Sequence, residues 1–169
     1  MTLQAFVNKY GKYALSAKKD GIYPSVSLAV AYLESNKPGG VSLLAEKYNN
    51  FHGIQVYPKF KGQTIKLTDA QKGDIRTFCR FPDPQSGFDG FTKFLKANPR
   101  YAKAGVFTAT TPGEQIKRIA SAGYSETGTW ELMVNRINPL IPTIPGGDTL
   151  LVILILGISM ALFAFMGRK

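Results

Sequence analysis

The chain has one cysteine and one histidine among its 169 residues, and both shortages limit the chemistry open to it. Cys79 has no second cysteine with which to pair, which excludes an intrachain disulfide and a zinc site built from several thiolates. His52 is equally alone, which argues against a zinc enzyme and against a hydrolase with a Cys/His pair. We therefore expect neither a bound metal nor a cofactor.

Several sequence signatures are also missing. No internal repeat, glycine-rich phosphate loop, dinucleotide fingerprint or serine nucleophile elbow occurs in the sequence. The first residues lack the uninterrupted apolar core and small-residue cleavage site of a secretory signal. Their apolar side chains instead recur at three- and four-residue spacing, which predicts an amphipathic helix belonging to the fold. These side chains are Leu3, Phe6, Val7, Tyr10, Tyr13, Ala14 and Ala17.

Acidic residues are few relative to basic ones. Lysine and arginine total 21 against 11 aspartate and glutamate, which gives a net charge of +10. This excess favours a polyanionic environment such as nucleic acid, anionic lipid or a negatively charged cell wall. It is equally compatible with a simple role in solubility. Charge alone does not decide among these interpretations. We expect no specific nucleic-acid partner.

Charge is entirely absent near the end of the chain. The stretch from Thr149 to Met166 runs uncharged for about 18 residues, close to the roughly 20 that span a bilayer core. We predict a transmembrane helix over 149–166, followed by a basic tail at 167–169 that lies among headgroups. Before it, residues 138–148 contain three prolines and two glycines, which predicts a semi-extended linker.

The remaining residues, 1–137, are long enough for one domain, and we predict that it is mainly helical. Pro24 suits a first helical turn, and the apolar run after it predicts a core helix that stops at residues 36–40. Further helices are predicted at 41–48, around 88–95, from Pro112 to about 122, and at 130–137. A small hairpin is predicted within 53–67, with its turn at Lys61 and Gly62.

Glu34 is the carboxylate whose predicted setting suggests chemistry. It stands at the C-terminal end of the apolar helix, where the helix dipole and the apolar neighbours both disfavour its charged form. A carboxylic acid that stays protonated near neutral pH can give a proton to a leaving oxygen, as glycosidase acids do. A glutamate at a helix end is also commonly a solvated surface residue, and this local evidence alone does not separate the two interpretations.

Four segments in order supply the wider pattern. They are "SVSLAVAYLES", "LAEKYNNFHGIQ", "FCRFPDPQSGFDGFTKFLKANPRY" and "SAGYSETGTW". Together they resemble the glucosaminidase family, glycoside hydrolase family 73, which includes the peptidoglycan hydrolase domain of flagellar assembly proteins and many bacterial autolysins. The resemblance covers about Phe6 to Ile137.

The resemblance implies a role for several residues. Glu34 falls on the family's catalytic acid, and Tyr124 on a tyrosine important for activity. The other matching positions imply substrate binding along the cleft: Ser35, Asn49, Asn50, His52, Gly53, Tyr101, Glu126 and Trp130. Three of these depart from the family pattern, because His52 stands where phenylalanine is commoner, Glu126 for an aspartate and Trp130 for a tyrosine.

The partner of Glu34 stays open. Asp69 lies where family members often place a second carboxylate, and Asp74 follows a few residues later. A base acting on water would lie about 6.5–9.5 Å from the acid and give inversion, whereas a closer pair would give retention. The substrate's own N-acetyl group is an alternative, with Tyr124 stabilising charge. Asp69 is equally compatible with a purely structural capping box between Thr68 and Gln71.

The resemblance implies a lysozyme-like, two-lobed domain, mainly α with a small β-hairpin lobe, whose cleft cuts the β-1,4 bonds of peptidoglycan glycan strands. A lytic transglycosylase on the same polymer is one alternative. Others are a catalytically weak wall-binding protein and a structural virion membrane protein. Without a signal, a C-terminal anchor would leave the domain on the cytoplasmic side. We therefore expect location in the internal membrane of a bacteriophage, with virion or capsid proteins as possible partners, or else in the bacterial inner membrane.

Overall fold

The computed structural model describes residues 1–68, 73–124 and 129–145. Its α-helices are α1 (Leu3–Ala14), α2 (Pro24–Ser35), α3 (Leu43–Tyr48), α4 (Pro84–Ala97), α5 (Pro99–Lys103), α6 (Pro112–Ser121) and α7 (Trp130–Ile137). Three 3-10 helices join them: η1 (Leu15–Asp20), η2 (Val106–Thr108) and η3 (Asn138–Thr143). The strands form two antiparallel pairs, β1 (Asn36–Lys37) with β2 (Gly40–Val41), and β3 (Thr64–Thr68) with β4 (Ile75–Cys79). This composition is consistent with the predicted lysozyme-like domain.

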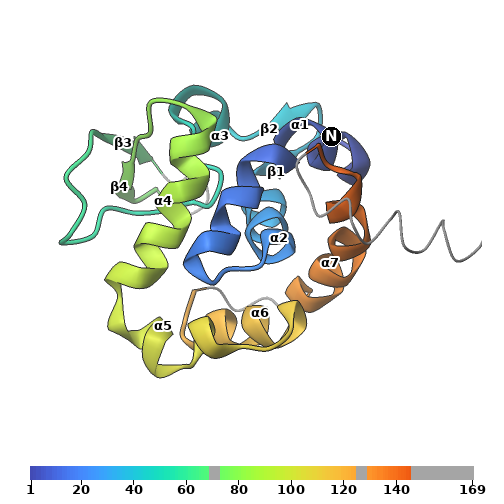
Figure 1. The fold of residues 1–169 in the computed structure, drawn as a ribbon. Helices are drawn as coiled ribbons and strands as arrows, with labels where there is room; N and C mark the ends of the chain where they lie inside the picture. The colour runs from blue at the N-terminus through green and yellow to red at the C-terminus, as the bar shows by residue number, and fades with distance from the viewer. Residues whose placement is uncertain (69–72, 125–128, 146–169) are drawn as a thin grey trace, which may run out of the picture.

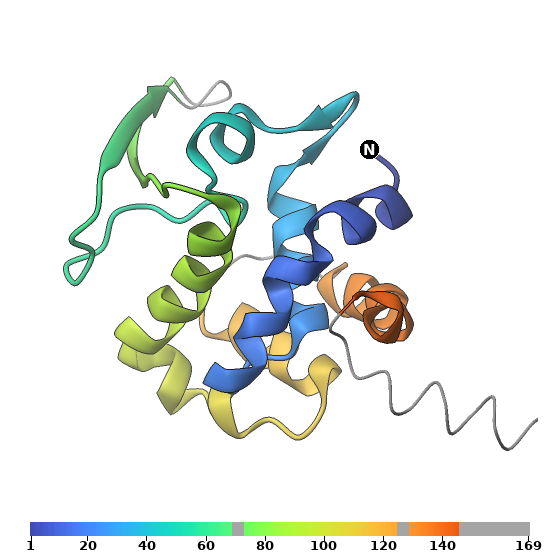
Figure 2. The same cartoon turned by 45° about the horizontal axis from the view of Figure 1, so that its top comes forward.

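Helix α2 is the centre of the structure, with α1, α6 and α7 packed against it (Figures 1 and 2). Pro24 occupies its first turn, as predicted, because proline needs no hydrogen-bond partner for the missing N–H there. Every residue from Pro24 to Ala31 is buried, so α2 has no polar face until its last turn. The final turn leaves this core, and it carries Glu34 to the surface.

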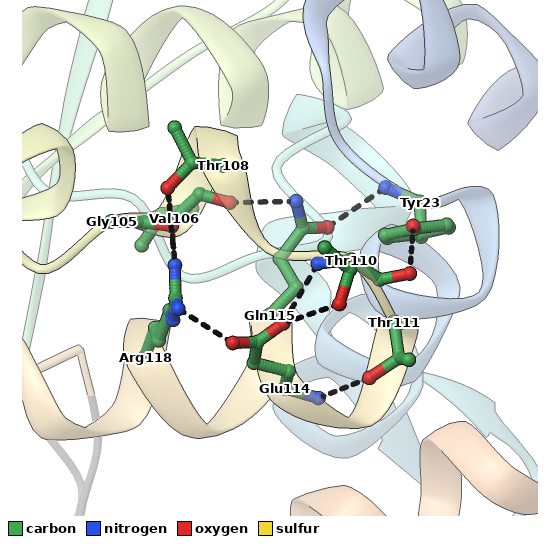
Figure 3. A network of polar contacts seen from close by, with 9 residues as sticks. All are labelled: Tyr23, Gly105, Val106, Thr108, Thr110, Thr111, Glu114, Gln115 and Arg118. Carbon is green, nitrogen blue, oxygen red and sulfur yellow. Dashed lines mark hydrogen bonds and ion pairs between the residues drawn. The ribbon is translucent and has the colours of Figure 1, made fainter.

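Gln115 fixes the beginning of α2. Its side chain is fully buried on α6, where its Oε1 accepts the backbone N–H of Tyr23 at 2.8 Å. Its Nε2 donates to the carbonyl of Gly21 at 2.7 Å. The same nitrogen donates to the carbonyl of Val106 at 2.9 Å (Figure 3). A buried amide with all these partners rigidifies the elements that it joins. No sequence pattern indicates this role, since Gln115 lies in an otherwise ordinary helical pattern.

Thr111 caps the beginning of α6, with one difference from a usual capping box. The Thr111 hydroxyl accepts the N–H of Glu114 at 3.1 Å, as an N-cap does. The Glu114 carboxylate, however, reaches the N–H of Thr110 at 2.7 Å rather than that of Thr111 (Figure 3). Its other oxygen pairs with Arg118 one turn later. The box therefore closes one residue earlier than the usual reciprocal pattern.

The hairpin lies further along the chain than we predicted. Strands β3 and β4 pair from Thr64 with Cys79 to Thr68 with Ile75, so the turn follows Thr68 instead of lying at Lys61 and Gly62. Residues 57–63 form a loop in which the Phe60 ring folds over Gly62, where a Cβ would lie 2.6 Å from that ring. The glycine is needed for this close contact and not for a hairpin turn.

The segment 138–144 is also different from its prediction. In place of a semi-extended linker, η3 covers Asn138–Thr143, and Ile144 is buried against α1. A Cβ on Gly11 would lie 2.5 Å from Ile144 Cδ1, so a glycine in the middle of α1 makes room for this side chain. Burial of the isoleucine on a groove of α1 holds the segment to the domain.

No helix in residues 1–68, 73–124 and 129–145 is long and apolar enough to cross a membrane. The predicted span at 149–166 and its basic tail lie outside the described residues.

Candidate active site

A groove of about 960 Å³ runs between the helices and the β3–β4 hairpin. The last turn of α2 contributes Glu34 to its wall, and the segment 52–56 forms the adjoining surface. The hairpin closes one side with Leu67 and Phe78, while Phe94 of α4 and Tyr124 line the other. The groove is therefore built from segments spread over most of the described chain, and Glu34 is the one carboxylate among its described lining residues.

The Glu34 carboxylate faces solvent on the side of the groove and lies close to the protein backbone on its other side. A Cβ on Gly53 would lie 3.2 Å from Glu34 Oε2, so the backbone of this glycine approaches the carboxylate directly. The partial removal of water raises the pKa of Glu34 above its usual range. The direction is the one expected from sequence, and it favours a carboxyl group that holds its proton at higher pH than a free glutamate does.

The loop 49–54 beside Glu34 has a defined geometry. Asn49 ends α3 in the left-handed region with φ 54°, and Gly53 has φ 64°. The buried Asn50 side chain holds the loop closed: its Oδ1 accepts the N–H of Ile54 at 2.9 Å, and its Nδ2 donates to the carbonyls of Ile54 and Cys79. Asn50 thus fixes the backbone that approaches the carboxylate.

His52 lies within the core beneath the groove. Its ring stacks on Phe91 with centroids 4.3 Å apart and an interplanar angle of 8°. Its Nε2 lies 3.1 Å from the carbonyl of Ser27, and burial lowers the pKa of His52 to about 3. The imidazole is therefore neutral at physiological pH and packs as an aromatic ring, which explains how it occupies a position where phenylalanine is commoner.

Tyr124 connects this loop to the turn after α6. Its hydroxyl donates to the His52 carbonyl at 2.6 Å, and its ring contacts Tyr101 and Trp130. Desolvation raises the pKa of Tyr124 well above its usual value, with Glu34 and Tyr101 adding to the rise. The phenol stays neutral, and its one proton is held by the backbone carbonyl, so in this arrangement Tyr124 positions the loop next to Glu34.

The structure brings together some of the predicted site residues and separates others. Glu34, His52, Gly53, Tyr101 and Tyr124 line one groove. Ser35 is buried and donates to the Ala31 carbonyl at 2.6 Å, Asn49 donates to the Phe81 carbonyl at 3.0 Å, and Trp130 is 3% exposed. With Asn50, these three side chains lie outside the groove lining. Asp69 and Glu126 fall outside the described residues.

Three cationic residues of the groove were not singled out from sequence: Lys37, Arg76 and Arg100. Arg100 directly precedes Tyr101 in the "NPRY" segment and donates to its hydroxyl at 2.7 Å. Arg76 faces the groove because side chains of a strand alternate, but that face becomes known only with the register of the hairpin. No three metal-ligating side chains of the described residues are close enough together to hold a metal ion.

The arrangement suits acid catalysis on a neutral or acidic polymer. A carboxyl group with a raised pKa faces an open groove in which cations are the other charged groups. Such a group can protonate a leaving oxygen, and the cations can attract an anionic substrate.

Comparison with known proteins agrees with this chemistry. Residues 11–140 match the family model described as Glucosaminidase: Mannosyl-glycoprotein endo-beta-N-acetylglucosaminidase. A comparison with curated proteins gives no match.

Solved structures that are similar to the chain include the following three. The glycoside hydrolase domain of FlgJ from Salmonella typhimurium has a TM-score of 0.58 and 20% identity, with 100% of each chain covered. The peptidoglycan hydrolase from Sphingomonas sp. A1 has a TM-score of 0.61 and 19% identity over 79% of this chain and 86% of its own. The catalytic domain of the autolysin Auto from Listeria monocytogenes has a TM-score of 0.60 and 26% identity, covering 81% and 83%.

Proposed function

Because the chain belongs to the glucosaminidase family and is a glycoside hydrolase, we propose that it cleaves β-1,4 bonds between N-acetylglucosamine and N-acetylmuramic acid in peptidoglycan. The observation that carries the proposal is Glu34, a carboxylic acid with a raised pKa on the wall of an open groove. The likeness to the autolysin Auto supports the choice of polymer.

Glu34 is the proposed general acid. Its protonated carboxyl gives the proton to the glycosidic oxygen while the bond to the anomeric carbon breaks, and the positive charge develops on the sugar ring. The water whose oxygen bonds to the anomeric carbon releases one proton, and one proton returns to the Glu34 carboxylate, which restores the carboxylic acid. Lys37, Arg76 and Arg100 would attract the carboxylates of muramic acid and its peptide.

The water is activated in one of two proposed ways. Asp69, which follows the last residue of β3, is the candidate base on the hairpin side. The alternative is the N-acetyl group of the substrate, whose oxygen bonds to the anomeric carbon as the protonated leaving oxygen departs. Water then adds to that carbon and breaks its bond to the N-acetyl oxygen, with no second carboxylate as nucleophile.

Mass spectrometry of the fragments released from purified peptidoglycan tests the proposed reaction. Hydrolysis should leave reducing sugar ends, and the identity of the reducing sugar gives the bond that is cut. Fragments ending in 1,6-anhydro sugar would instead identify a lytic transglycosylase, because that product forms when the sugar's own hydroxyl replaces water. The absence of any released fragment would support a wall-binding or structural protein and contradict the proposal.

We also propose that residues 149–166 attach the enzyme to a lipid membrane, and that this membrane belongs to a bacteriophage particle that must cut the wall locally. The uncharged sequence of this segment supports the proposal. The full chain should float with lipid vesicles, and a full-length Leu154→Lys, Ile158→Lys variant should not, since each charge costs about 3 kcal/mol at the centre of a span. If both proteins sediment while the vesicles float, the proposed attachment is contradicted. If the protein is absent from purified phage particles, the proposed location in the virion is contradicted.

A further inference from the structure

A second hollow of about 760 Å³ lies next to the groove. It is formed by the loop 57–63, the segment from Arg80 to Pro82 and one face of α4. Tyr57 lines this hollow and Phe94 lines the groove, and their rings touch with centroids 5.3 Å apart. The two spaces are thus separated by one pair of aromatic rings. We call the second space the basic hollow.

The charge of the basic hollow is of one sign. Five exposed cations border it: Lys47, Lys59, Lys61, Arg80 and Lys93. No described aspartate or glutamate lines it, and no ion pair within residues 1–68, 73–124 and 129–145 involves any of the five. Cations gathered without acidic partners repel one another and favour a bound anion.

Two acidic residues close in sequence to Arg80 and Lys93 make hydrogen bonds within the domain. Asp83 accepts the N–H of Ser86 at 2.7 Å as the N-cap of α4. Asp89 accepts hydrogen bonds from Ser16 at 2.6 Å and Gln85 at 3.1 Å. These contacts hold both carboxylates within the domain, and neither residue lines the hollow.

The wall of the basic hollow is aromatic. Phe60 contacts Tyr57 at 5.8 Å and Phe81 at 5.8 Å between ring centroids. Gly90 of α4 permits the closeness of Phe81, because a Cβ there would lie 2.4 Å from its ring. Cations around an apolar ring surface form a site for a molecule that has both anionic groups and C–H faces, as a charged sugar has.

We propose that the basic hollow binds an anionic glycan of the cell wall, a sugar polymer carrying phosphate or carboxylate groups, at a site separate from the cleavage groove. This inference rests on the proposed function for the choice of a wall polymer. A bound polymer beside the groove would hold the enzyme on the wall between cleavage events, which raises the effective concentration of substrate.

The geometry favours a glycan over a single-stranded nucleic acid. Sequence-independent nucleic-acid sites present exposed aromatic faces on which successive bases stack. Here Phe60 and Phe81 meet at an interplanar angle of 74°. Phe81 is 8% exposed, and Tyr57 and Phe60 are partly buried. No parallel platform is available, whereas C–H groups of sugars need only partial ring surfaces.

The test compares a Lys59→Gln, Lys61→Gln, Arg80→Gln variant with a Lys9→Gln, Lys12→Gln, Lys103→Gln variant, which removes the same charge elsewhere. Both are made in the full chain with Glu34→Gln, so binding is measured whether or not the enzyme cleaves the wall. The probes are a purified wall teichoic acid for phosphate, oligogalacturonate for carboxylate, neutral chitohexaose and a 12-nucleotide single-stranded DNA. Thermal unfolding verifies that both variants are folded.

We expect the hollow variant to bind one of the two anionic glycans roughly tenfold more weakly than its parent at low salt, because three exposed charge contacts are lost. The matched variant should change by less than about twofold. The anionic probe whose binding is weakened shows whether the hollow recognises phosphate or carboxylate. The binding of chitohexaose should change in neither variant. The proposal would be overturned if both variants bound the anionic glycans equally more weakly, or if neither did. It would also be overturned if the same three residues bound the DNA more tightly than they bind either anionic glycan.

Discussion

Replacement of Glu34 by glutamine should lower kcat on purified peptidoglycan by roughly 10²- to 10⁴-fold, the usual contribution of a general acid. Glutamine has nearly the same size and keeps a hydrogen-bonding group beside Gly53, but it has no proton to give to the leaving oxygen. Binding to the wall should be nearly unchanged, since the glycine backbone that approaches this side chain is held independently by Asn50. The loss is therefore expected in kcat, with little change in KM.

Release of soluble fragments from purified walls measures this effect, with Glu46→Gln as the matched control. Glu46 is an exposed glutamate on α3 that does not line the groove. The control should keep the rate of the unmodified enzyme. Retention of more than about a tenth of the activity by Glu34→Gln would remove Glu34 from the acid role.

The pH dependence of kcat gives a second check on the same residue. Desolvation raises the pKa of Glu34, and the general acid acts only while it is protonated. Activity should therefore persist above the pKa of an ordinary glutamate and fall as the pH rises through the raised pKa of Glu34. Residual activity of the glutamine variant should lack this decrease, because the titrating group is absent.

The parts of the fold that follow from local sequence were predictable. Pro24 and the apolar run after it define α2, and the position of Glu34 at its end follows directly. The helix beginning at Pro112 is likewise defined by its own cap. The site is less local: Gly53 lies beside Glu34 only because Asn50 binds to Ile54 and to Cys79, which is far away in sequence.

The errors have the same origin. Lys61 followed by Gly62 predicted the hairpin turn. The Phe60 ring occupies the space beside Gly62, and the pairing of β3 with β4 begins only at Thr64. The prolines and glycines of 138–148 predicted a linker, but burial of Ile144 against Gly11 holds η3 on the domain. A contact within one loop in the first case, and a contact between distant segments in the second, outweighs the local preference of glycine or proline.

Asn49 and Asn50 show why a motif residue does not by itself identify a ligand contact. Both were predicted to bind substrate because they match one motif, but their environments differ. Asn49 makes one side-chain hydrogen bond and holds a left-handed backbone, with φ 54°, that glycine adopts without strain. Asn50 is 1% exposed and makes three hydrogen bonds, all to backbone groups of the groove loop and β4.

Asn50→Ala should lower the free energy of unfolding by about 3 kcal/mol, since each of three buried hydrogen bonds contributes about 1 kcal/mol. Asn49→Gly should change it by less than about 1 kcal/mol, because the loss of one hydrogen bond is offset by relief of the left-handed backbone. Thermal unfolding should show a decrease of about 10 °C in Tm for Asn50→Ala alone. A Tm close to that of the unmodified protein, together with a raised KM, would instead make Asn50 a substrate contact, as its motif first indicated.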